Sequence, residues 1–249
     1  MNSSSLSIDP SNNQTKKRLL TQILIIIPAY NEAESLQQLI SEIKSLNKKV
    51  SILVVDDGSS DHTTSVAYDM GVKVITLPFN LGIGGAVQTG YKYAYDKGYD
   101  IAVQVDGDGQ HDVTYLSKLL KPILTDQADM VIGSRFMTNE LGYKSSFVRR
   151  IGIRFFSNLI SFLTGNVVTD PTSGFRAVNS KLIKVFARYY PQDFPEPEAI
   201  MVAGRKEGRI MEVSVKMRPR VTGSSSIRYL KTFYYMTKVT LALLIEKLK

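Results

Sequence analysis

Cysteine is absent from this 249-residue sequence. Its absence excludes a disulfide-stabilised scaffold and a catalytic thiolate, and it leaves oxygen and imidazole groups to bind any metal ion. Long apolar segments are absent as well. The longest uncharged run near the C-terminus covers only residues 239–245, because Lys238 and Glu246 interrupt it, whereas about 20 apolar residues are needed to span a bilayer. These absences predict a cytoplasmic protein, either soluble or peripheral to a membrane.

Acidic residues are outnumbered, with 23 Asp and Glu against 31 Lys and Arg, which gives a net charge of +8. Such a balance predicts an anionic partner, and the candidates are nucleic acid, an acidic membrane surface or phosphorylated substrates. The basic residues are dispersed, and no nucleic-acid-binding motif of known spacing is present. A nucleic-acid-binding α/β protein is therefore the weakest alternative, and we expect no nucleic-acid partner.

The chain is predicted to have three parts. Residues 1–21 are rich in Ser and Asn and carry a basic cluster without a signal-peptide cleavage site, so they are expected to form a disordered polar tail. Residues 22–217 suit one α/β domain, since 43% of the sequence is hydrophobic and can fill a substantial core. Residues 218–249 are expected to form a loop followed by an amphipathic helix.

Strands and helices alternate through the first half of the chain. An apolar run that ends at Pro28 predicts a strand buried on both faces, and apolar residues at helical spacing follow it, from Leu36 to Leu46. The predicted strands are residues 23–27, 52–55, 72–77, 101–105 and 130–132. This alternation predicts a Rossmann-like, doubly wound and mostly parallel sheet flanked by helices.

Polar side chains follow each predicted strand. The segments are residues 28–32 (Pro-Ala-Tyr-Asn-Glu), 56–61 (Asp-Asp-Gly-Ser-Ser-Asp), 80–82 (Asn-Leu-Gly), 106–110 (Asp-Gly-Asp-Gly-Gln) and 133–135 (Gly-Ser-Arg). Ligands of open α/β sheets bind beyond the carboxyl ends of the strands. The sequence therefore predicts one binding site at that edge of the sheet.

Asp106 and Asp108 can direct two carboxylates toward one hard cation such as Mg²⁺ or Mn²⁺, and Gln110 can add a carbonyl oxygen. The alternative is a simple turn, because Asp and Gly are the commonest turn formers. An EF-hand is excluded, since it needs Gly and Glu where His111 and Ser117 stand. A haloacid-dehalogenase-type phosphatase fits poorly because its motif follows the first strand. The glycines at 82–85 lack the position and spacing of a dinucleotide-binding motif.

Five ordered motifs resemble those of the family 2 glycosyltransferases, in the branch of dolichyl-phosphate mannose synthase and the bacterial polyprenyl-phosphate glycosyltransferases. They are residues 28–32, 56–61, 80–82, 106–110 and 170–176. The resemblance covers about residues 23–226. It implies a GT-A type fold and a displacement of nucleoside diphosphate that inverts the anomeric carbon.

The resemblance also implies the donor and metal sites. A UDP- or GDP-sugar would contact Pro28, Tyr30, Glu32, Asp57, Asn80, Asp106 and Gly107. Asp106, Asp108 and Gln110 would hold Mg²⁺ or Mn²⁺ at the diphosphate. A divalent cation stabilises the negative charge that develops on the leaving group as the glycosidic bond breaks.

Arginines are candidates for the remaining phosphate charge, because a planar guanidinium suits bidentate phosphate contacts. Arg135 and Arg220 are assigned to catalysis, and Arg176, with Ser225, to acceptor binding. Residues 218–226 resemble the family's Arg-x-x-Gly-x-Ser loop, which closes over the site and excludes water. A flexible linker is the alternative for this segment.

Three carboxylates are candidates for a general base, which transfer to a hydroxyl requires and transfer to an anionic phosphate does not. Asp170 is the first candidate, although it can equally be a capping or turn residue before Pro171. Glu198, with Glu196 beside it, is the second. We expect only one of the three to be essential.

Two later segments have helical stripes of apolar residues. The first stripe consists of Val148, Ile151, Phe155, Leu159 and Phe162, and the second of Leu230, Phe233, Tyr234, Leu241, Leu244 and Leu248 beside basic residues. Either helix can face an anionic membrane or pack on the protein's own core, and the second can also pack on a twin subunit. Peripheral binding at the inner membrane face, with a membrane partner protein or a homo-oligomer, is the resulting prediction.

The leading hypothesis is a metal-dependent hexosyltransferase that uses a nucleotide sugar and polyprenyl phosphate. The alternative acceptor is a growing cell-envelope polysaccharide or teichoic-type polymer, because many relatives in this branch carry transmembrane helices and this sequence has none.

Overall fold

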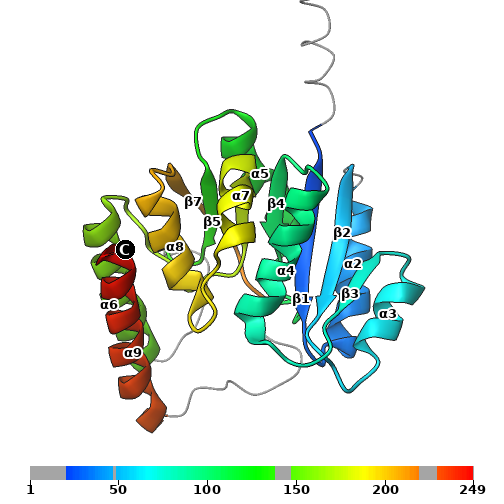
Figure 1. The fold of residues 1–249 in the computed structure, drawn as a ribbon, viewed down its shortest axis with the longest axis horizontal. Helices are drawn as coiled ribbons and strands as arrows, with labels where there is room; N and C mark the ends of the chain where they lie inside the picture. Colours follow the sequence, from blue (N-terminus) through cyan, green and yellow to red (C-terminus); the bar gives the residue numbers. More distant parts are fainter. Residues whose placement is uncertain (1–20, 47–48, 138–146, 219–228, 249) are drawn as a thin grey trace, which may run out of the picture.

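The computed structural model describes residues 21–46, 49–137, 147–218 and 229–248. They form a seven-stranded sheet in the order β3-β2-β1-β4-β6-β5-β7, with helices on both faces (Figure 1). The strands are β1 (Ile23–Ala29), β2 (Val50–Asp56), β3 (Lys73–Thr76), β4 (Ile101–Gln104), β5 (Met130–Ser134), β6 (Arg176–Asn179) and β7 (Ile210–Ser214). The α-helices are α2 (Ala33–Ser45), α3 (Thr63–Asp69), α4 (Gly82–Asp96), α5 (Leu116–Leu124), α6 (Phe147–Thr164), α7 (Ser180–Arg188), α8 (Pro195–Arg205) and α9 (Tyr229–Leu248).

The sheet is mostly parallel, as the sequence predicts. Strands β1 to β4 pair in parallel, and so do β5 and β7. Strand β6 lies between β4 and β5 and runs antiparallel to both. All five predicted strands are present, while β6 and β7 were not predicted because both are short and neither has a long apolar run.

The strands are buried on both faces. Leu24 and Ile26 of β1 join the core beneath α4, α7 and α8, and Ile25 and Ile27 join the core beneath α2, α3 and α5. All four side chains are fully buried. The alternation of side chains along a strand divides a continuous apolar run between two helical layers.

Two glycines of α4 allow close packing. A Cβ at Gly84 would lie 2.5 Å from the backbone oxygen of Pro191, and one at Gly90 would collide with the side chain of Ile26. Gly82 begins the helix with a φ of 82°, a conformation that glycine adopts without strain. This geometry forms a tight turn into the helix.

Helix α6 is present, but its predicted apolar stripe is not its buried face. Ile153, Phe156 and Ile160 are buried, whereas Phe155 and Phe162 are 43% and 85% exposed. The side chains of Val148 and Ile151 lie outside the described part. The helix therefore has one face in the core and an apolar face toward solvent.

Helix α9 also has one buried face and one exposed apolar face. Val239 and Leu243 are fully buried in the core that α4, α7 and α8 share, while Leu241, Leu244 and Leu248 are exposed. Glu246 is also buried. Its carboxylate forms an ion pair with Arg205 of α8 at 2.8 Å and accepts a hydrogen bond from the hydroxyl of Tyr189 at 2.9 Å, which holds α9 in place. Within the described residues, no helix has the length and apolarity needed to cross a membrane.

Candidate functional site

A cavity of about 390 Å³ opens at the carboxyl edge of β1, β2 and β4. It is lined by Pro28, Ala29, Tyr30, Glu32, Asp57, Asn80, Gly82, Ile83, Ala86, Asp106, Gly107 and Asp108. All seven residues predicted to bind the donor are among them. The parallel strands bring together motifs that are far apart in the sequence, as expected for an open α/β sheet.

The first two loops are fastened to each other. Asn31 has a left-handed φ of 56°. Its side-chain Oδ1 accepts a hydrogen bond from the backbone amide of Ser60 at 2.9 Å, and its backbone amide donates to Ser59 Oγ at 2.9 Å. The amide of Glu32 donates to Thr63 Oγ1 at 2.9 Å. These bonds hold Tyr30 and Glu32 at the mouth of the cavity, where the side chain of Tyr30 is half exposed.

Asp57 joins the second loop to the start of α4. Its two carboxylate oxygens accept from the backbone amides of Leu81 and Gly82 at 2.7 and 2.9 Å. Burial raises the pKa of Asp57, and the two amide hydrogen bonds lower it only in part. A carboxyl group held in this way lies in the cavity wall with a fixed orientation.

The predicted metal loop presents two carboxylates to the cavity. Asp106 Oδ1 accepts from Gln104 Nε2 at 3.1 Å, and Oδ2 lies 3.0 Å from His111 Nε2. Burial alone would raise the pKa of Asp106, but His111, Gln104 and the charge of Arg176 lower it below its usual value. Asp108 accepts from the backbone amide of Gln110 at 3.0 Å.

This donor set fits a hard cation. Asp106 is held in its anionic form, and Asp108 stands two residues away along the same cavity wall. The described residues contain no cluster of three or more His, Asp or Glu side chains placed to bind a metal. Any cation here would therefore depend on the two carboxylates, the Gln110 carbonyl and oxygens of the ligand itself.

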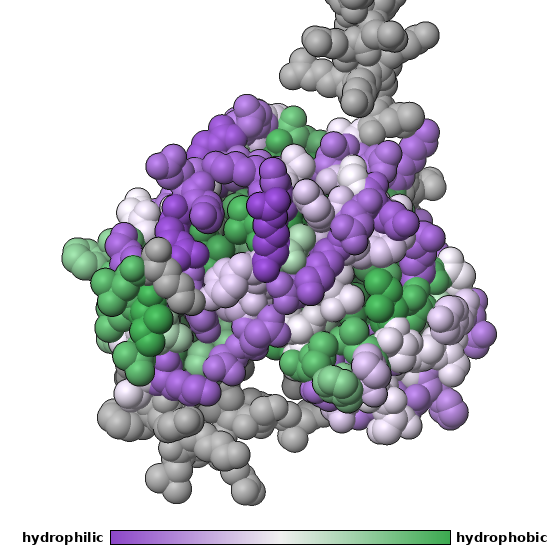
Figure 2. Space-filling model, viewed as in Figure 1, coloured by the Kyte–Doolittle hydropathy of each residue, from purple (hydrophilic) through white to green (hydrophobic). Residues whose placement is uncertain are grey.

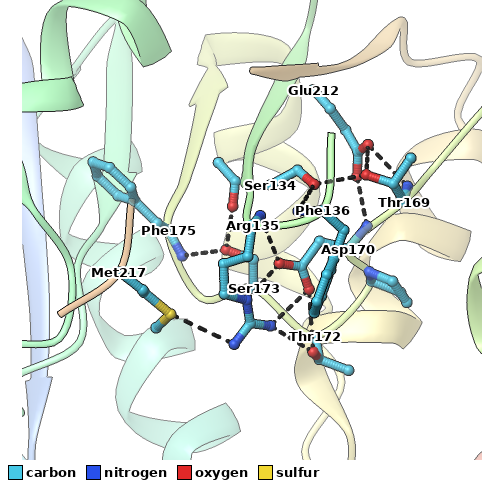
Figure 3. Close-up of polar contacts among 12 residues, drawn as sticks. Ser134, Arg135, Phe136, Thr169, Asp170, Thr172, Ser173, Phe175, Glu212 and Met217 are labelled. Atoms are coloured by element: carbon cyan, nitrogen blue, oxygen red, sulfur yellow. Dashed lines mark hydrogen bonds and ion pairs between the residues drawn. The ribbon is translucent and has the colours of Figure 1, made fainter. Parts of the chain in front are cut away.

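Asp170 occupies a different place from the one predicted for a general base. It is fully buried, and Figure 3 shows its carboxylate facing the guanidinium of Arg135. Oδ2 accepts from Arg135 Nε at 2.6 Å, and Oδ1 accepts from Nη2 at 2.7 Å and from Thr172 Oγ1 at 3.2 Å. Both carboxylate oxygens are engaged within the protein and the side chain has no exposed surface, an arrangement that favours the structural alternative over the general base. Its geometry supports a structural role.

Arg135 is likewise a buried residue. Besides Asp170, its Nη2 donates to Thr172 Oγ1 at 2.8 Å and its Nη1 to Met217 Sδ at 3.5 Å. Glu212 closes the other side of this cluster by accepting from the amides of Thr169 and Asp170 at 2.8 and 2.9 Å (Figure 3). The loop from Thr169 to Ser173 is thereby fixed between β5 and β7.

Arg176 is only 1% exposed, which does not agree with its predicted role in acceptor binding. Its guanidinium donates to the backbone oxygens of Ser173, Glu196 and Pro171 at 2.6, 2.5 and 3.0 Å. Three carbonyl partners direct this side chain inward. Arg176 therefore holds the 171–173 loop against the start of α8. Its positive charge also lowers the pKa of Asp106.

Glu196 and Glu198 lie in the first turn of α8, both partly buried. Burial raises the pKa of Glu196; Arg176 opposes that shift and Asp106 adds to it. Glu196 is thus close enough to Asp106 for their charges to interact.

Arg220 and Ser225, predicted for catalysis and acceptor binding, lie outside the described residues. Arg218, at the end of the described segment, is hydrogen-bonded to the predicted metal loop. Its amide donates to Gln110 O at 2.8 Å, and its guanidinium pairs with Glu42 at 2.7 Å.

Gln104 and His111 are site residues that sequence reasoning missed. Gln104 is a polar residue within a buried strand. Such a residue is a signal of function, but a search for hydrophobic periodicity does not detect it. His111 follows the predicted metal loop directly, but only the fold shows that its ring lies against Asp106.

Comparison with known proteins places these features in a family. Residues 24–186 match the family model described as glycosyl transferase family 2. The UDP-N-acetylglucosamine–dolichyl-phosphate N-acetylglucosaminyltransferase of Methanococcus voltae is 32% identical over 213 residues, which cover 78% of this chain and 84% of the relative. The undecaprenyl-phosphate mannosyltransferase of Micrococcus luteus is 33% identical over 168 residues, covering 66% and 68%.

A solved structure has the same fold. Glucosyl-3-phosphoglycerate synthase from Mycobacterium tuberculosis, in complex with Mn²⁺, UDP and glucosyl-3-phosphoglycerate, aligns with a TM-score of 0.70 at 20% identity. The alignment covers 98% of this chain and 86% of that one. It confirms the predicted GT-A type α/β fold.

Proposed function

The chain belongs to glycosyl transferase family 2, and we propose that it transfers a hexose, with inversion, from a UDP- or GDP-sugar to polyprenyl phosphate. The observation that carries this proposal is that Asp57, Asp106 and Asp108 line one cavity together. The Methanococcus relative is named for dolichyl phosphate and the Micrococcus relative for undecaprenyl phosphate, and both names support the acceptor class.

The donor's diphosphate would be held at Asp106, Asp108 and Gln110 with Mg²⁺ or Mn²⁺. The cation, when bound, would neutralise charge on the leaving nucleoside diphosphate. The chain's own contribution is to keep Asp106 anionic and to place both carboxylates on one wall. The mycobacterial synthase, whose complex contains Mn²⁺ and UDP, has the same fold and supports this use of the site.

A phosphate acceptor agrees with the engagement of Asp170. A phosphate oxygen is already anionic near neutral pH and needs positioning more than deprotonation. Arg135 and Arg220 are proposed to supply positive charge near the acceptor, and Ser225 a hydrogen bond. Glu198 remains the candidate base for the alternative in which a glycan hydroxyl is the acceptor.

The acceptor lipid would be reached from the membrane surface. Figure 2 shows apolar side chains gathered at the left edge of the molecule, where Figure 1 places α6 and α9. Phe155, Phe162, Leu244 and Leu248 are exposed apolar residues of these two helices. Lys238 and Lys247 of α9 are exposed beside them. An apolar face with basic neighbours suits the headgroup region of an anionic membrane, so we propose peripheral binding at the cytoplasmic face.

A donor screen tests the proposed function. The purified chain is incubated with UDP-, GDP- and dTDP-hexoses and Mn²⁺, with and without a short polyprenyl phosphate, and released nucleotide and glycolipid are measured. We expect one nucleotide to be used, and the release to rise when the lipid phosphate is present. Release that responds only to a glycan acceptor would favour the polysaccharide alternative.

The same assay tests the metal site. Asp108→Ala should lower turnover about 100-fold, because a cation that stabilises the leaving group contributes several kcal/mol. The exposed Asp69→Ala is the matched control and should be unchanged. Full activity of Asp108→Ala would refute the metal assignment.

A further inference from the structure

The Asp106 carboxylate has a buried rear side that is separate from the cavity. Gln104 and His111 contact it there, each with only 1% of its surface exposed. Gln104 Nε2 donates to Oδ1 at 3.1 Å, and His111 Nε2 lies 3.0 Å from Oδ2. One partner thus holds each carboxylate oxygen from behind, while the side chain of Asp106 remains 31% exposed on the cavity side.

The orientation of Gln104 is set from deeper in the core. The hydroxyl of Tyr190 donates to Gln104 Oε1 at 3.5 Å, which leaves the amide nitrogen of Gln104 to face Asp106. Burial raises the pKa of Tyr190 well above its usual value, so its hydroxyl keeps the proton that it donates. Tyr91 and Phe186 pack around the Tyr190 ring, with centroids 5.3 and 5.2 Å away.

His111 is fixed by different elements. Its ring lies against Phe175, with centroids 5.2 Å apart, and its backbone forms a β-bridge to Met217. Gly174 completes the enclosure, because a Cβ there would lie 2.7 Å from Asp106 Oδ1 and still closer to Oδ2. The carboxylate therefore fits between a histidine, a glutamine and a glycine, with little freedom to rotate.

We propose that Gln104 and His111 are positioning residues, which hold the Asp106 carboxylate with its outward lone pairs toward the divalent cation. Residues that hydrogen-bond a metal-ligating group fix the orientation of that group. Their loss commonly weakens metal binding roughly 10- to 100-fold. Tyr190 acts one step further back by orienting Gln104. This inference rests on the proposed metal-dependent function of the same site.

Manganese binding provides a test that does not require turnover. Mn²⁺ is titrated into the chain in the presence of saturating UDP, and separately GDP, and free Mn²⁺ is followed by its electron paramagnetic resonance signal. Gln104→Met keeps the length and volume of the side chain but removes the donor. Its apparent Kd for Mn²⁺ should rise about tenfold or more, and Tyr190→Phe should give a smaller rise. The exposed Gln127→Met is the matched control and should bind like the wild type.

His111 is tested by rescue. His111→Phe should weaken Mn²⁺ binding to a similar degree, while His111→Gln, which retains an N–H donor, should recover part of it. Thermal unfolding of each variant separates loss of fold from loss of positioning. Variants that stay folded and bind Mn²⁺ with wild-type affinity would overturn the positioning role. If the wild type itself binds no Mn²⁺ with either nucleotide, the proposed metal-dependent function fails instead.

Discussion

The contacts of Asp170 give this single residue a role that its position before Pro171 does not predict. Its carboxylate is fully buried and bound on both oxygens by Arg135. Removing one partner of a buried ion pair leaves the other charge uncompensated, which typically costs several kcal/mol. Asp170 therefore contributes to stability.

Asp170→Asn should accordingly destabilise the fold. We expect a loss of about 3 kcal/mol in the free energy of unfolding, which corresponds to a fall in Tm on the order of 6–12 °C for a domain of this size. Differential scanning calorimetry measures it, with the exposed Asp69→Asn as control. An unchanged Tm together with abolished turnover would instead identify Asp170 as the general base.

Among the secondary-structure elements, β5, β6 and β7 are joined by one carboxylate. Asp129, at the start of β5, accepts from the Arg209 amide beside β7 at 2.8 Å and from Asn179 Nδ2 of β6 at 2.7 Å. Burial would raise the pKa of Asp129, but its bonds to Arg209 and Asn179 lower it below the usual value. A single buried side chain thus fixes the antiparallel strand between two parallel neighbours.

Asp129→Ala should lower the free energy of unfolding by about 2 kcal/mol near pH 7, because it leaves buried donors unsatisfied. A carboxyl whose pKa is lower in the folded state stabilises the fold above its unfolded pKa of about 3.9, and that contribution is lost as the pH falls through the folded value. Urea denaturation at pH 7 and at about pH 3 should therefore show the difference between wild type and variant shrinking in acid.

Asp126→Asn is the control for the Asp129 experiment, because Asn removes the charge and tolerates the left-handed φ of 55° at this position. Asp126 pairs with the same arginine, at 2.6 Å, but its side chain is 90% exposed, and exposed ion pairs contribute little to stability. We expect its denaturation curve to overlay that of the wild type. An equal loss in both variants would mean that Arg209, and not the burial of Asp129, is decisive.

For the whole molecule, net charge and the exposed apolar face of α6 and α9 combine into a membrane-binding prediction. With a net charge of +8, the chain should float with anionic vesicles and less with neutral ones. Leu244→Asp combined with Leu248→Asp should reduce the bound fraction about tenfold or more, since each leucine contributes roughly 1.5–3 kcal/mol when buried. Leu124→Asp, at an exposed site on α5, is the matched control.

Two results of the flotation experiment would contradict the membrane-binding prediction. Equal binding by the double variant and by the Leu124 control would show that charge alone attracts the protein, and that the α6 and α9 face has another use. Binding to neither vesicle type would remove the peripheral membrane proposal and favour a soluble glycan acceptor.

The amino-acid sequence alone determined where the cavity would form. Pro28, Asp57 and Asp106 each follow an apolar run, and parallel strands necessarily end at the same edge of a sheet. The repeated alternation of strand and helix likewise determined the α/β class, because hydrophobic periodicity is a local property of the chain. Neither result required knowledge of which side chains would meet.

Only the tertiary structure decided how the charged residues are paired. Arg135 and Asp170 are 35 positions apart, and no local pattern predicts that they form one buried ion pair. The same holds for Gln104, which meets Tyr190 across 86 positions, and for the exposure of Phe162. The spacing of residues in the sequence determines which side chains share one face of a helix or strand. Which residues that face contacts depends on how distant elements pack. The roles of individual polar side chains in this protein were therefore fixed by the fold.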